Sequence, residues 1–440
     1  MTVLEHLMVR SIRKRPAGVP INTLARALNR SALQHLAHDG ALLFLTRFVR
    51  MFSYGALSVV LVLYLTGCGL SESQTGMLLT LTLLGDTLIS LVLTTQADRI
   101  GRRRMLITVA VLMAGAGLTF ACTNNFLFLV VAGTIGVISP SGNEVGPFLS
   151  IEQAALSQVI PAQARTAVFA WYTLIGAIAS AVGSLFAGLS SQKLQRAAIT
   201  PVGSERAIIL VYAVLGLLLA LLFRRLSSAA EVRRADGGRT NAKSLLGIGP
   251  SRAVVLKLSG LFALDAFGGG FVVQSFAAYW FYLRFGVNPA MLGGIFFGAN
   301  VLGGFSALVA SRLASRFGLI RTMVYTHLPS NILLILVPLM PNLSLAVLVL
   351  LLRFSVSQMD VPTRQSYTMA IVHADERSSA AGITGVARTT GAAMAPVFAG
   401  LLFARPSLIN LPFFIAGTLK IIYDLALYRA FVRLQPPEDR

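Results

Sequence analysis

Long apolar segments, separated by short polar or basic stretches, follow one another along almost the whole chain. Because a helix needs about 20 consecutive apolar residues to cross the hydrocarbon core of a bilayer, each run of that length is a candidate span. Twelve such segments lie at residues 41–66, 73–95, 104–122, 126–158, 166–190, 206–224, 253–283, 289–311, 321–340, 343–371, 378–404 and 408–432. The pattern predicts an all-α membrane protein with twelve transmembrane helices.

Composition supports this class. The 440 residues are 55% hydrophobic and only 12% charged, whereas soluble globular domains carry about twice that charged share. The formal net charge of +20 would suit a nucleic-acid-binding protein. However, the arginines lie between apolar runs rather than on aromatic-rich polar elements. We therefore expect the chain to contact a lipid bilayer and no nucleic acid.

Lysine and arginine are unevenly distributed between the polar segments. Basic loops are retained in the cytoplasm, so the richer side is the inner one. The outer loops hold Lys193, Arg196, Arg206, Arg284 and Arg405, and the other loops and both tails hold most of the remaining basic residues. This predicts a multi-pass cell-membrane protein with both termini cytoplasmic. No cleavable signal peptide is visible, because the first apolar run begins near Ala41.

A polar, arginine-rich linker at residues 225–252 divides the spans into two groups of six. The predicted domains are an N-terminal tail at 1–39, six-helix bundles at 40–224 and 253–433, and a C-terminal tail at 434–440. Within the first tail, residues 20–38 form either a short amphipathic helix on the inner membrane surface or a mobile segment. Cys68 and Cys122 fall at predicted outer ends of spans, where either a disulfide or two separate thiols is compatible.

Two internal repeats relate the halves. Ala97-Asp-Arg-Ile-Gly101 lies 217 residues before Ala314-Ser-Arg-Phe-Gly318, again between apolar segments. A second, ungapped repeat with an offset of 212 matches residues 160–188 to 372–400, and extended backwards it sets Glu152 against Arg364. The repeats predict two structurally related halves with a site between them near mid-membrane.

The most specific stretch is the basic turn after the second span, where Asp98-Arg-Ile-Gly-Arg-Arg103 resembles the signature of the major facilitator superfamily of secondary transporters. One departure is Thr94, where members usually carry glycine. The resemblance implies two pseudo-symmetric six-helix bundles around a cavity lined by the first, fourth, seventh and tenth spans. It also implies gating roles for Asp98, at the inner end of the eleventh span, and for Arg102.

Ionisable residues within a bilayer cost several kcal/mol each, so they are expected to face a partner or a cavity. Those in the predicted spans are Arg47, Arg50, Asp86, Glu144, Glu152, Lys257, Asp265, Arg353, Asp360, Arg364, Arg388, Lys420 and Asp424. The near balance of basic and acidic residues predicts pairing within the protein. Lys420 and Asp424, four residues apart on the last span, are expected to satisfy each other.

Helical spacing gathers these residues into two stripes. Arg47, Arg50, Tyr54 and Ser58 share one face of the first span, and Arg353, Ser357, Asp360 and Arg364 share one face of the tenth. The candidates for substrate binding or proton coupling are Arg47, Arg50, Tyr54, Glu144, Glu152, Asp265, Asp360 and Arg364. The alternative is that these charges form pairs that merely lock helices together.

Two helix breaks are expected beside the candidates. Pro147 cannot donate the hydrogen bond that a continuous fourth helix needs, close to Glu144, and Gly268, Gly269 and Gly270 form a soft point after Asp265. A simple kink at Pro147 is the alternative.

Asp86 and Arg388 are predicted to lie at similar depths in the second and eleventh spans. There they would either pair as a gate between the halves or leave Asp86 to pair with Arg50.

No enzymatic or nucleotide-binding constellation is found. There is no phosphate-binding glycine loop, no nucleophile elbow, and no metal-ligand spacing among the five histidines. We therefore expect a monomeric, non-enzymatic transporter without a cofactor, driven by a proton gradient and moving a small organic solute by alternating access. The arginines favour an anionic solute, although the acidic residues would offset them. Proton-driven efflux of drug-like compounds and a non-transporting receptor or scaffold are the alternatives.

Overall fold

The computed structural model describes residues 30–142, 147–159, 165–227, 231, 249–373 and 376–432. In this part of the chain, the regular structure is helical. Eleven segments are long and apolar enough to cross a membrane, and one further apolar helix, α6 (Phe126–Ile135), is shorter. With α6 as the first part of the fourth span, the described elements account for the twelve predicted spans.

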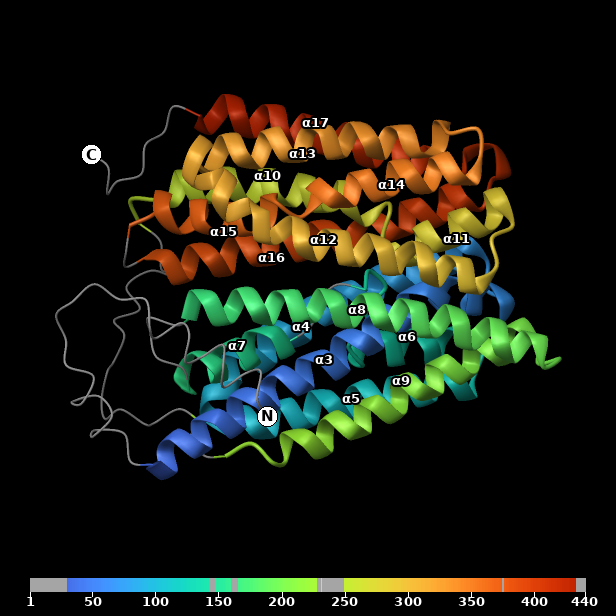
Figure 1. Cartoon of the computed structure of the whole chain (residues 1–440), viewed down its shortest axis with the longest axis horizontal. Coiled ribbons are helices and arrows are strands. Elements are labelled where there is room, and N and C mark those ends of the chain that lie inside the picture. Colours follow the sequence, from blue (N-terminus) through green and yellow to red (C-terminus); the bar gives the residue numbers. More distant parts are fainter. Residues whose placement is uncertain are drawn as a thin grey trace.

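The helices form two groups that lie one above the other in Figure 1. The N-terminal group comprises α3 (Arg30–Gly67), α4 (Glu72–Ile100), α5 (Arg102–Cys122), α6, α7 (Phe148–Val159), α8 (Arg165–Arg196) and α9 (Pro201–Phe223). The C-terminal group comprises α10 (Arg252–Gly270), α11 (Gln274–Phe285), α12 (Pro289–Phe317), α13 (Leu319–Leu336), α14 (Leu343–Ser357), α15 (Asp360–Ile371), α16 (Arg377–Phe403) and α17 (Leu411–Phe431).

Three spans are broken into two helices each. The fourth consists of α6 and α7, the seventh of α10 and α11, and the tenth of α14 and α15. The break after Gly270 lies where the glycine run predicted it. The fourth-span break begins earlier than Pro147, because Gly136 caps α6 and Val137 has a φ of 55°. The break in the tenth span, at Gln358 and Met359, was not predicted.

The described chain begins and ends on the same side of the bundle, which we call the terminal face, and the opposite side is the far face (Figure 1). Toward the far face, α4 packs on α16 and α8 packs on α12. At the first crossing, a Cβ atom on Gly400 would lie 2.9 Å from the Cα of Gly76. At the second, a Cβ on Gly188 would lie 2.8 Å from the Cα of Gly293. Only glycine permits such close helix contacts.

These four glycines follow the sequence repeats. Gly76 and Gly293 are 217 residues apart, and Gly188 and Gly400 are 212 residues apart, the same offsets that relate the two halves. The two crossings are therefore repeat-related, which confirms the prediction of two related halves.

Beyond the glycine crossing toward the terminal face, the Val397 N–H donates a hydrogen bond of 2.9 Å to the Thr80 hydroxyl. Gly385 lies three helical turns before Pro396 on the same face of α16, and a Cβ atom there would meet no atom within 4 Å. The halves are thus joined tightly near the far face, and α16 is open around Gly385, nearer the terminal face.

The ends of the first span differ from the prediction. α3 begins at Arg30 and runs without interruption into the first span, so residues 30–38 of the expected surface segment belong to the spanning helix. Residues 20–29 lie outside the described residues.

Cys68 and Cys122 are both free thiols, so the disulfide alternative is wrong for this structure.

Candidate functional site

The N-terminal half holds a compact cluster around Glu152 of α7. One carboxylate oxygen accepts a hydrogen bond of 2.9 Å from the Thr46 hydroxyl, and the other contacts the Arg50 guanidinium and the Tyr172 hydroxyl. The side chains of Arg50 and Glu152 are both 0% exposed. One carboxylate and one guanidinium thus neutralise each other in a fully buried site made by α3, α7 and α8.

Arg47, one turn before Arg50 on α3, belongs to the same cluster. Its Nε donates a hydrogen bond of 2.6 Å to the Tyr172 carbonyl, and its guanidinium lies 4.0 Å from the centre of the Tyr172 ring. Gly176 leaves the space that this side chain needs, because a Cβ there would lie 2.7 Å from the guanidinium nitrogens. Tyr54 is fully buried beside Tyr212, so the predicted inward stripe of the first span is confirmed.

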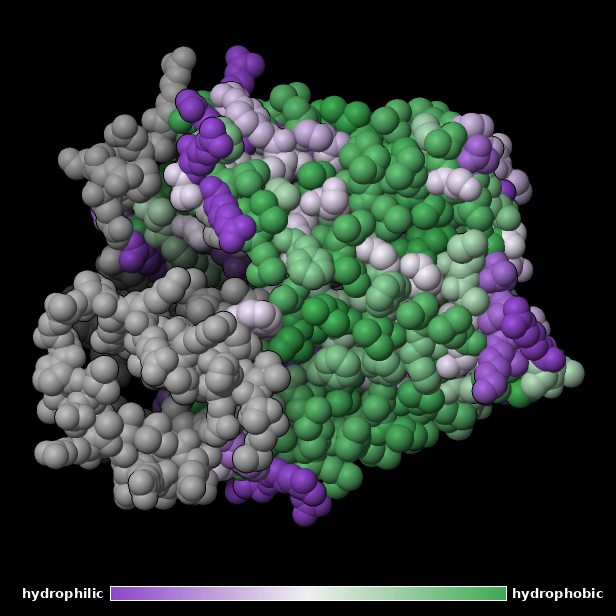
Figure 2. Space-filling view, viewed as in Figure 1, coloured by the Kyte–Doolittle hydropathy of each residue, from purple (hydrophilic) through white to green (hydrophobic). Residues whose placement is uncertain are grey.

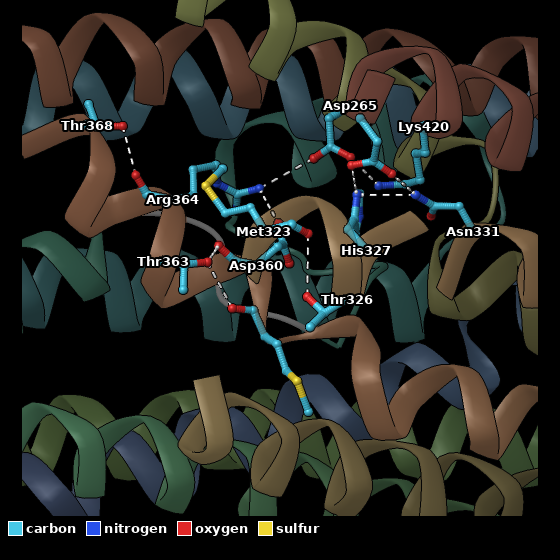
Figure 3. A network of polar contacts seen from close by, with 12 residues as sticks. Asp265, Met323, Thr326, His327, Asn331, Asp360, Thr363, Arg364, Thr368 and Lys420 are labelled. Atoms are coloured by element: carbon cyan, nitrogen blue, oxygen red, sulfur yellow. Dashed lines mark hydrogen bonds and ion pairs between the residues drawn. The ribbon is translucent and has the colours of Figure 1, made fainter. Parts of the chain in front are cut away.

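The C-terminal half holds a wider network centred on Asp265 of α10 (Figure 3). Its Oδ1 lies 2.6 Å from the Lys420 Nζ and 3.7 Å from the His327 Nε2, and its Oδ2 lies 3.4 Å from the Arg364 Nη1. Arg364 also contacts Asp360, one turn earlier on α15, at 2.7 Å. One buried carboxylate therefore faces three basic side chains from three other helices.

His327 of α13 bridges two carboxylates in this network. While its Nε2 faces Asp265, its Nδ1 lies 2.8 Å from the Asp424 Oδ1. Asn331, one turn later on α13, donates a hydrogen bond of 2.8 Å to the other oxygen of Asp424. The imidazole is only 6% exposed, so both of its ring nitrogens are directed at buried carboxylates.

The predicted candidates are therefore assembled into two sites rather than one. Glu152 and Arg364, which the repeat makes equivalent, each pair within their own half. Arg50 joins Glu152, and Asp360 with Asp265 joins Arg364. The expected pairing of Lys420 with Asp424 is wrong, because Lys420 contacts Asp265 and Asp424 contacts His327.

The structure describes the side chains of only some of the residues that were predicted to act in gating. Arg102 donates from its Nη1 to the Gln158 Oε1 at 2.6 Å, and its backbone N–H donates to the Glu231 carboxylate of the linker at 2.7 Å. Glu144 and the side chain of Asp98 lie outside the described residues. In the described part of the chain, Arg388 has no ion pair within 4 Å, so it does not contact Asp86 in this conformation. Their pairing when the gate closes stays a prediction.

His327 and Asn331 were missed from the sequence, where only carboxylates, lysines and arginines were taken as charged candidates. The available signal was their spacing, since a histidine and an asparagine four residues apart share one face of an apolar span. Among the described residues, no group of three or more histidine, cysteine, aspartate or glutamate side chains could hold a metal ion.

Uncharged groups join the halves at the broken spans. Ser275 of α11 donates from both its N–H and its hydroxyl to the Pro140 carbonyl, at 3.1 and 2.5 Å, in the fourth-span break. Gln274 donates to the hydroxyls of Ser58 and Ser184 at 2.8 and 3.2 Å. The start of α11 thus contacts three segments of the other half.

The outer surface carries the chemistry of a membrane protein. Figure 2 shows a broad hydrophobic band over the helices, with hydrophilic residues at the two ends of the molecule. This distribution matches a bilayer around the middle and water at both faces.

Known proteins that are similar to this chain are also membrane proteins. The chain is 31% identical over 424 residues to the uncharacterised membrane protein YJR124C of Saccharomyces cerevisiae, covering 90% of this chain and 94% of the relative. A bacterial homologue of the human lysosomal transporter Spinster, solved in an inward-facing and occupied conformation, matches with a TM-score of 0.69 at 16% identity, covering 90% of this chain and 97% of that one. The nucleoside transporter NupG matches with a TM-score of 0.71 at 12% identity, covering 90% and 99%.

At such identities the two solved structures establish the shared fold alone. The family match goes further, because residues 43–396 fit the sequence profile of the Major Facilitator Superfamily. This chain is a member of that superfamily of membrane transporters.

Proposed function

We propose that the chain is a proton-coupled secondary transporter that moves a small organic solute by alternating access, and that His327 carries the proton. The observation behind the proposal is the placement of both His327 ring nitrogens against carboxylates, Asp424 at 2.8 Å and Asp265 at 3.7 Å. Histidine is the side chain whose unperturbed pKa lies in the physiological range, and here it sits among groups that respond to its charge.

The chemistry follows from the number of N–H groups on the imidazole. A neutral ring has one N–H and can donate to only one carboxylate, whereas a protonated ring donates from both nitrogens. Protonation therefore ties α13 to Asp265 of α10 and to Asp424 of α17 at once. Deprotonation releases one of these links and leaves Lys420, at 2.6 Å, as the close partner of Asp265.

The broken seventh span offers a route from this proton to the junction of the halves. Asp265 lies on α10 shortly before the break at Gly270, and Gln274 and Ser275 begin α11 just beyond it. Those two residues hold the contacts to Ser58, Ser184 and Pro140 of the other half. A change in the Asp265 contacts would thus be transmitted over a short, bendable segment to the closed far face.

Other charged side chains surround His327 and influence its protonation. Asp265, Asp424 and Lys420 contact it or its partners directly, and Asp360 and Arg364 of α15 complete the surrounding groups. We further propose that the protein works as a monomer in the cell membrane with its terminal face toward the cytoplasm. It would need no bound cofactor, because the proton gradient supplies the energy.

Uphill transport in liposomes tests the proposal. A solute that raises the melting temperature of the purified protein is used as the substrate, and its accumulation is measured under an imposed pH gradient. His327→Gln should lose accumulation against the gradient while keeping solute exchange at equilibrium. His373→Gln, the same substitution at an exposed loop histidine, should behave as the parent. Full accumulation by His327→Gln would remove the proposed proton carrier.

A further inference from the structure

In the described helices, two arginines of the C-terminal half, Arg353 and Arg388, lack the carboxylate partner that Arg50 and Arg364 have. The Nε atoms of Arg353 on α14 and Arg388 on α16 are buried and make no hydrogen bond to any described residue. Arg50 and Arg364, by contrast, are paired with carboxylates. In the described part of the chain, no ion pair within 4 Å is found for Arg353 or Arg388.

An unpaired guanidinium is unfavourable in this position. Arginine does not give up its proton in proteins, so it cannot become neutral as a buried lysine or carboxyl can. Intramembrane charges accordingly mark binding sites or pathways. Both arginines are partly exposed, and each has a buried Nε donor that no described residue satisfies, so an entering acceptor could pair with them.

The two arginines belong to the same electrostatic neighbourhood. Gly391, one turn after Arg388, packs closely on the Ala263 backbone of α10, two residues before Asp265. Arg353 lies two helical turns before Asp360 in the broken tenth span. Both guanidinium groups thus share the carboxylates Asp265 and Asp360 as charged neighbours.

Ser357, one turn after Arg353 and next to the tenth-span break, has a buried hydroxyl that also lacks a partner among the described residues. Two donors without a described acceptor, the Arg353 Nε and the Ser357 hydroxyl, thus lie beside this break.

The charge balance of the neighbourhood is positive. Its fixed cations are Arg353, Arg364, Arg388 and Lys420, and its carboxylates are Asp265, Asp360 and Asp424. Four cations therefore face three anions even when His327 is neutral, and its protonation would add one more positive charge. An anion entering here would be attracted both by the unpaired guanidinium groups and by the net charge.

The surface of α16 beside Arg388 is open. Gly385, one turn before Arg388, has no atom within 4 Å of its Cβ position, and the neighbouring Thr389 is exposed. This part of α16 lies nearer the terminal face than the glycine crossing at Gly400.

We propose that Arg353 and Arg388 form a subsite for the anionic group of the transported solute, a carboxylate or a phosphate ester. Guanidinium groups suit both, because their planar N–H donors match the oxygens of carboxylate and phosphate. The subsite gives the substrate class of the proposed function and rests on that function. It assigns Arg388 to the solute, with the Ser357 hydroxyl as a further donor.

The test is thermal unfolding of the purified full chain in detergent at constant pH and ionic strength. Two matched pairs of probes are compared, succinate with succinamide and glycerol 3-phosphate with glycerol. At least one anion should raise the melting temperature of the parent by several degrees, and its uncharged analogue should not. The pair that responds identifies carboxylate or phosphate as the anionic group. Equal effects of charged and uncharged probes, or no effect of either anion, would overturn the subsite.

Substitutions localise the effect. Arg388→Gln and Arg353→Gln should each need at least tenfold more of the effective anion for the same shift, and Arg388→Lys should need less than Arg388→Gln. Arg405→Gln, at an exposed arginine, serves as the control. Without added anion, Arg388→Gln should melt no lower than the parent because it removes an uncompensated charge, whereas Arg364→Gln should melt lower.

A destabilised Arg388→Gln protein whose anion response is unchanged would show a structural arginine and refute the proposal. Failure of the subsite is distinguishable from failure of proton coupling, because no gradient is present in this assay. An anion response retained in a protein that shows no proton-driven accumulation contradicts the coupling alone. Proton-driven accumulation of an uncharged solute, with no anion response, contradicts the subsite alone.

Discussion

The two halves share a fold and a repeated sequence, yet their buried charges are organised differently. In the N-terminal half, Glu152 and Arg50 form one closed pair. Thr46 donates to the other Glu152 oxygen, and Tyr172 donates to the oxygen that Arg50 contacts. In the C-terminal half, Asp265 shares three basic partners, and a histidine lies between two carboxylates. The first arrangement is a single ion pair, whereas the second contains a histidine whose two ring nitrogens both face carboxylates.

The backbone differs in the same sense. The first span, which carries Arg47 and Arg50, is the continuous helix α3, whereas the equivalent seventh span is divided into α10 and α11 just after Asp265. A continuous helix holds its side chains in fixed register, and a broken one lets its two parts move separately. The comparison teaches that repeat-related positions can differ in their contacts and in backbone continuity, since the first span is continuous and the seventh is broken, while the fourth and tenth are both broken.

The largest expected effect comes from breaking the closed pair. Glu152→Gln leaves the Arg50 guanidinium buried without a counter-charge, which should cost about 3 to 5 kcal/mol of folding stability. Denaturant unfolding in detergent measures this cost. The double variant Arg50→Gln/Glu152→Gln, which leaves no unpaired charge, should recover a large part of it. A Glu152→Gln protein as stable as the parent would show that the pair does not hold this half together.

A smaller stability effect is expected at His327. His327→Gln removes contacts to Asp424 and Asp265, and hydrogen bonds to charged groups contribute about 1.5 to 3 kcal/mol each. Because Asn331 and Lys420 still contact the two carboxylates, the loss should fall near the lower end of that range. The same unfolding assay measures it. A loss as large as that of Glu152→Gln would mean that both clusters are structural locks.

The junction between the halves should respond to Gln274→Leu. The change removes hydrogen bonds to Ser58 and Ser184, each contributing about 0.5 to 1.5 kcal/mol, and should populate a state opened at the far face. Spectroscopic labels at the exposed Ser71 and Arg405, near the far ends of α4 and α16, report the distance across this face. A distance distribution identical to that of the parent would assign the closure to the glycine crossings instead.

The smallest effect is expected at the terminal face, where Glu376 accepts hydrogen bonds from the Gly249 and Ser251 N–H groups at the end of the linker. The Ser251 hydroxyl and these N–H groups hold the pKa of Glu376 below its usual value. The stabilisation from a lowered pKa is complete above the unfolded-state value of about 4.3. It is lost as the pH falls through the folded-state pKa.

Glu376→Gln should therefore lower the melting temperature slightly at pH 7, and the difference from the parent should shrink below pH 4. Melting curves between pH 7 and pH 3.5 measure this change. Glu231 accepts two backbone N–H groups in the same manner at the start of α5, so Glu231→Gln is the matching variant in the other half. A difference that grows on acidification would contradict the assigned role.

The sequence could predict the spans, the repeat and the burial of the charged stripes, because hydropathy, spacing and the cost of charge in lipid act along one helix at a time. It could not predict which helices face each other. Lys420 and Asp424 are neighbours along α17, yet each pairs with another helix, since spacing alone does not tell a local pair from two separate ones. The tenth-span break went unseen although Pro362, in the first turn of α15, was a signal for a new helix start.

The central claim is that a proton on His327 changes how far apart the two halves lie. It is tested most directly by measuring the distance between them as a function of pH. Labels are placed at Val92 on α4 and Val386 on α16, both exposed and nearer the terminal face than the glycine crossing, in a protein with Cys68 and Cys122 replaced. Between pH 8 and pH 5, the parent distance distribution should shift between two populations. His327→Gln should give one distribution throughout, and Glu152→Gln, where it folds, should shift as the parent does. A shift of the parent's size in His327→Gln would contradict the account.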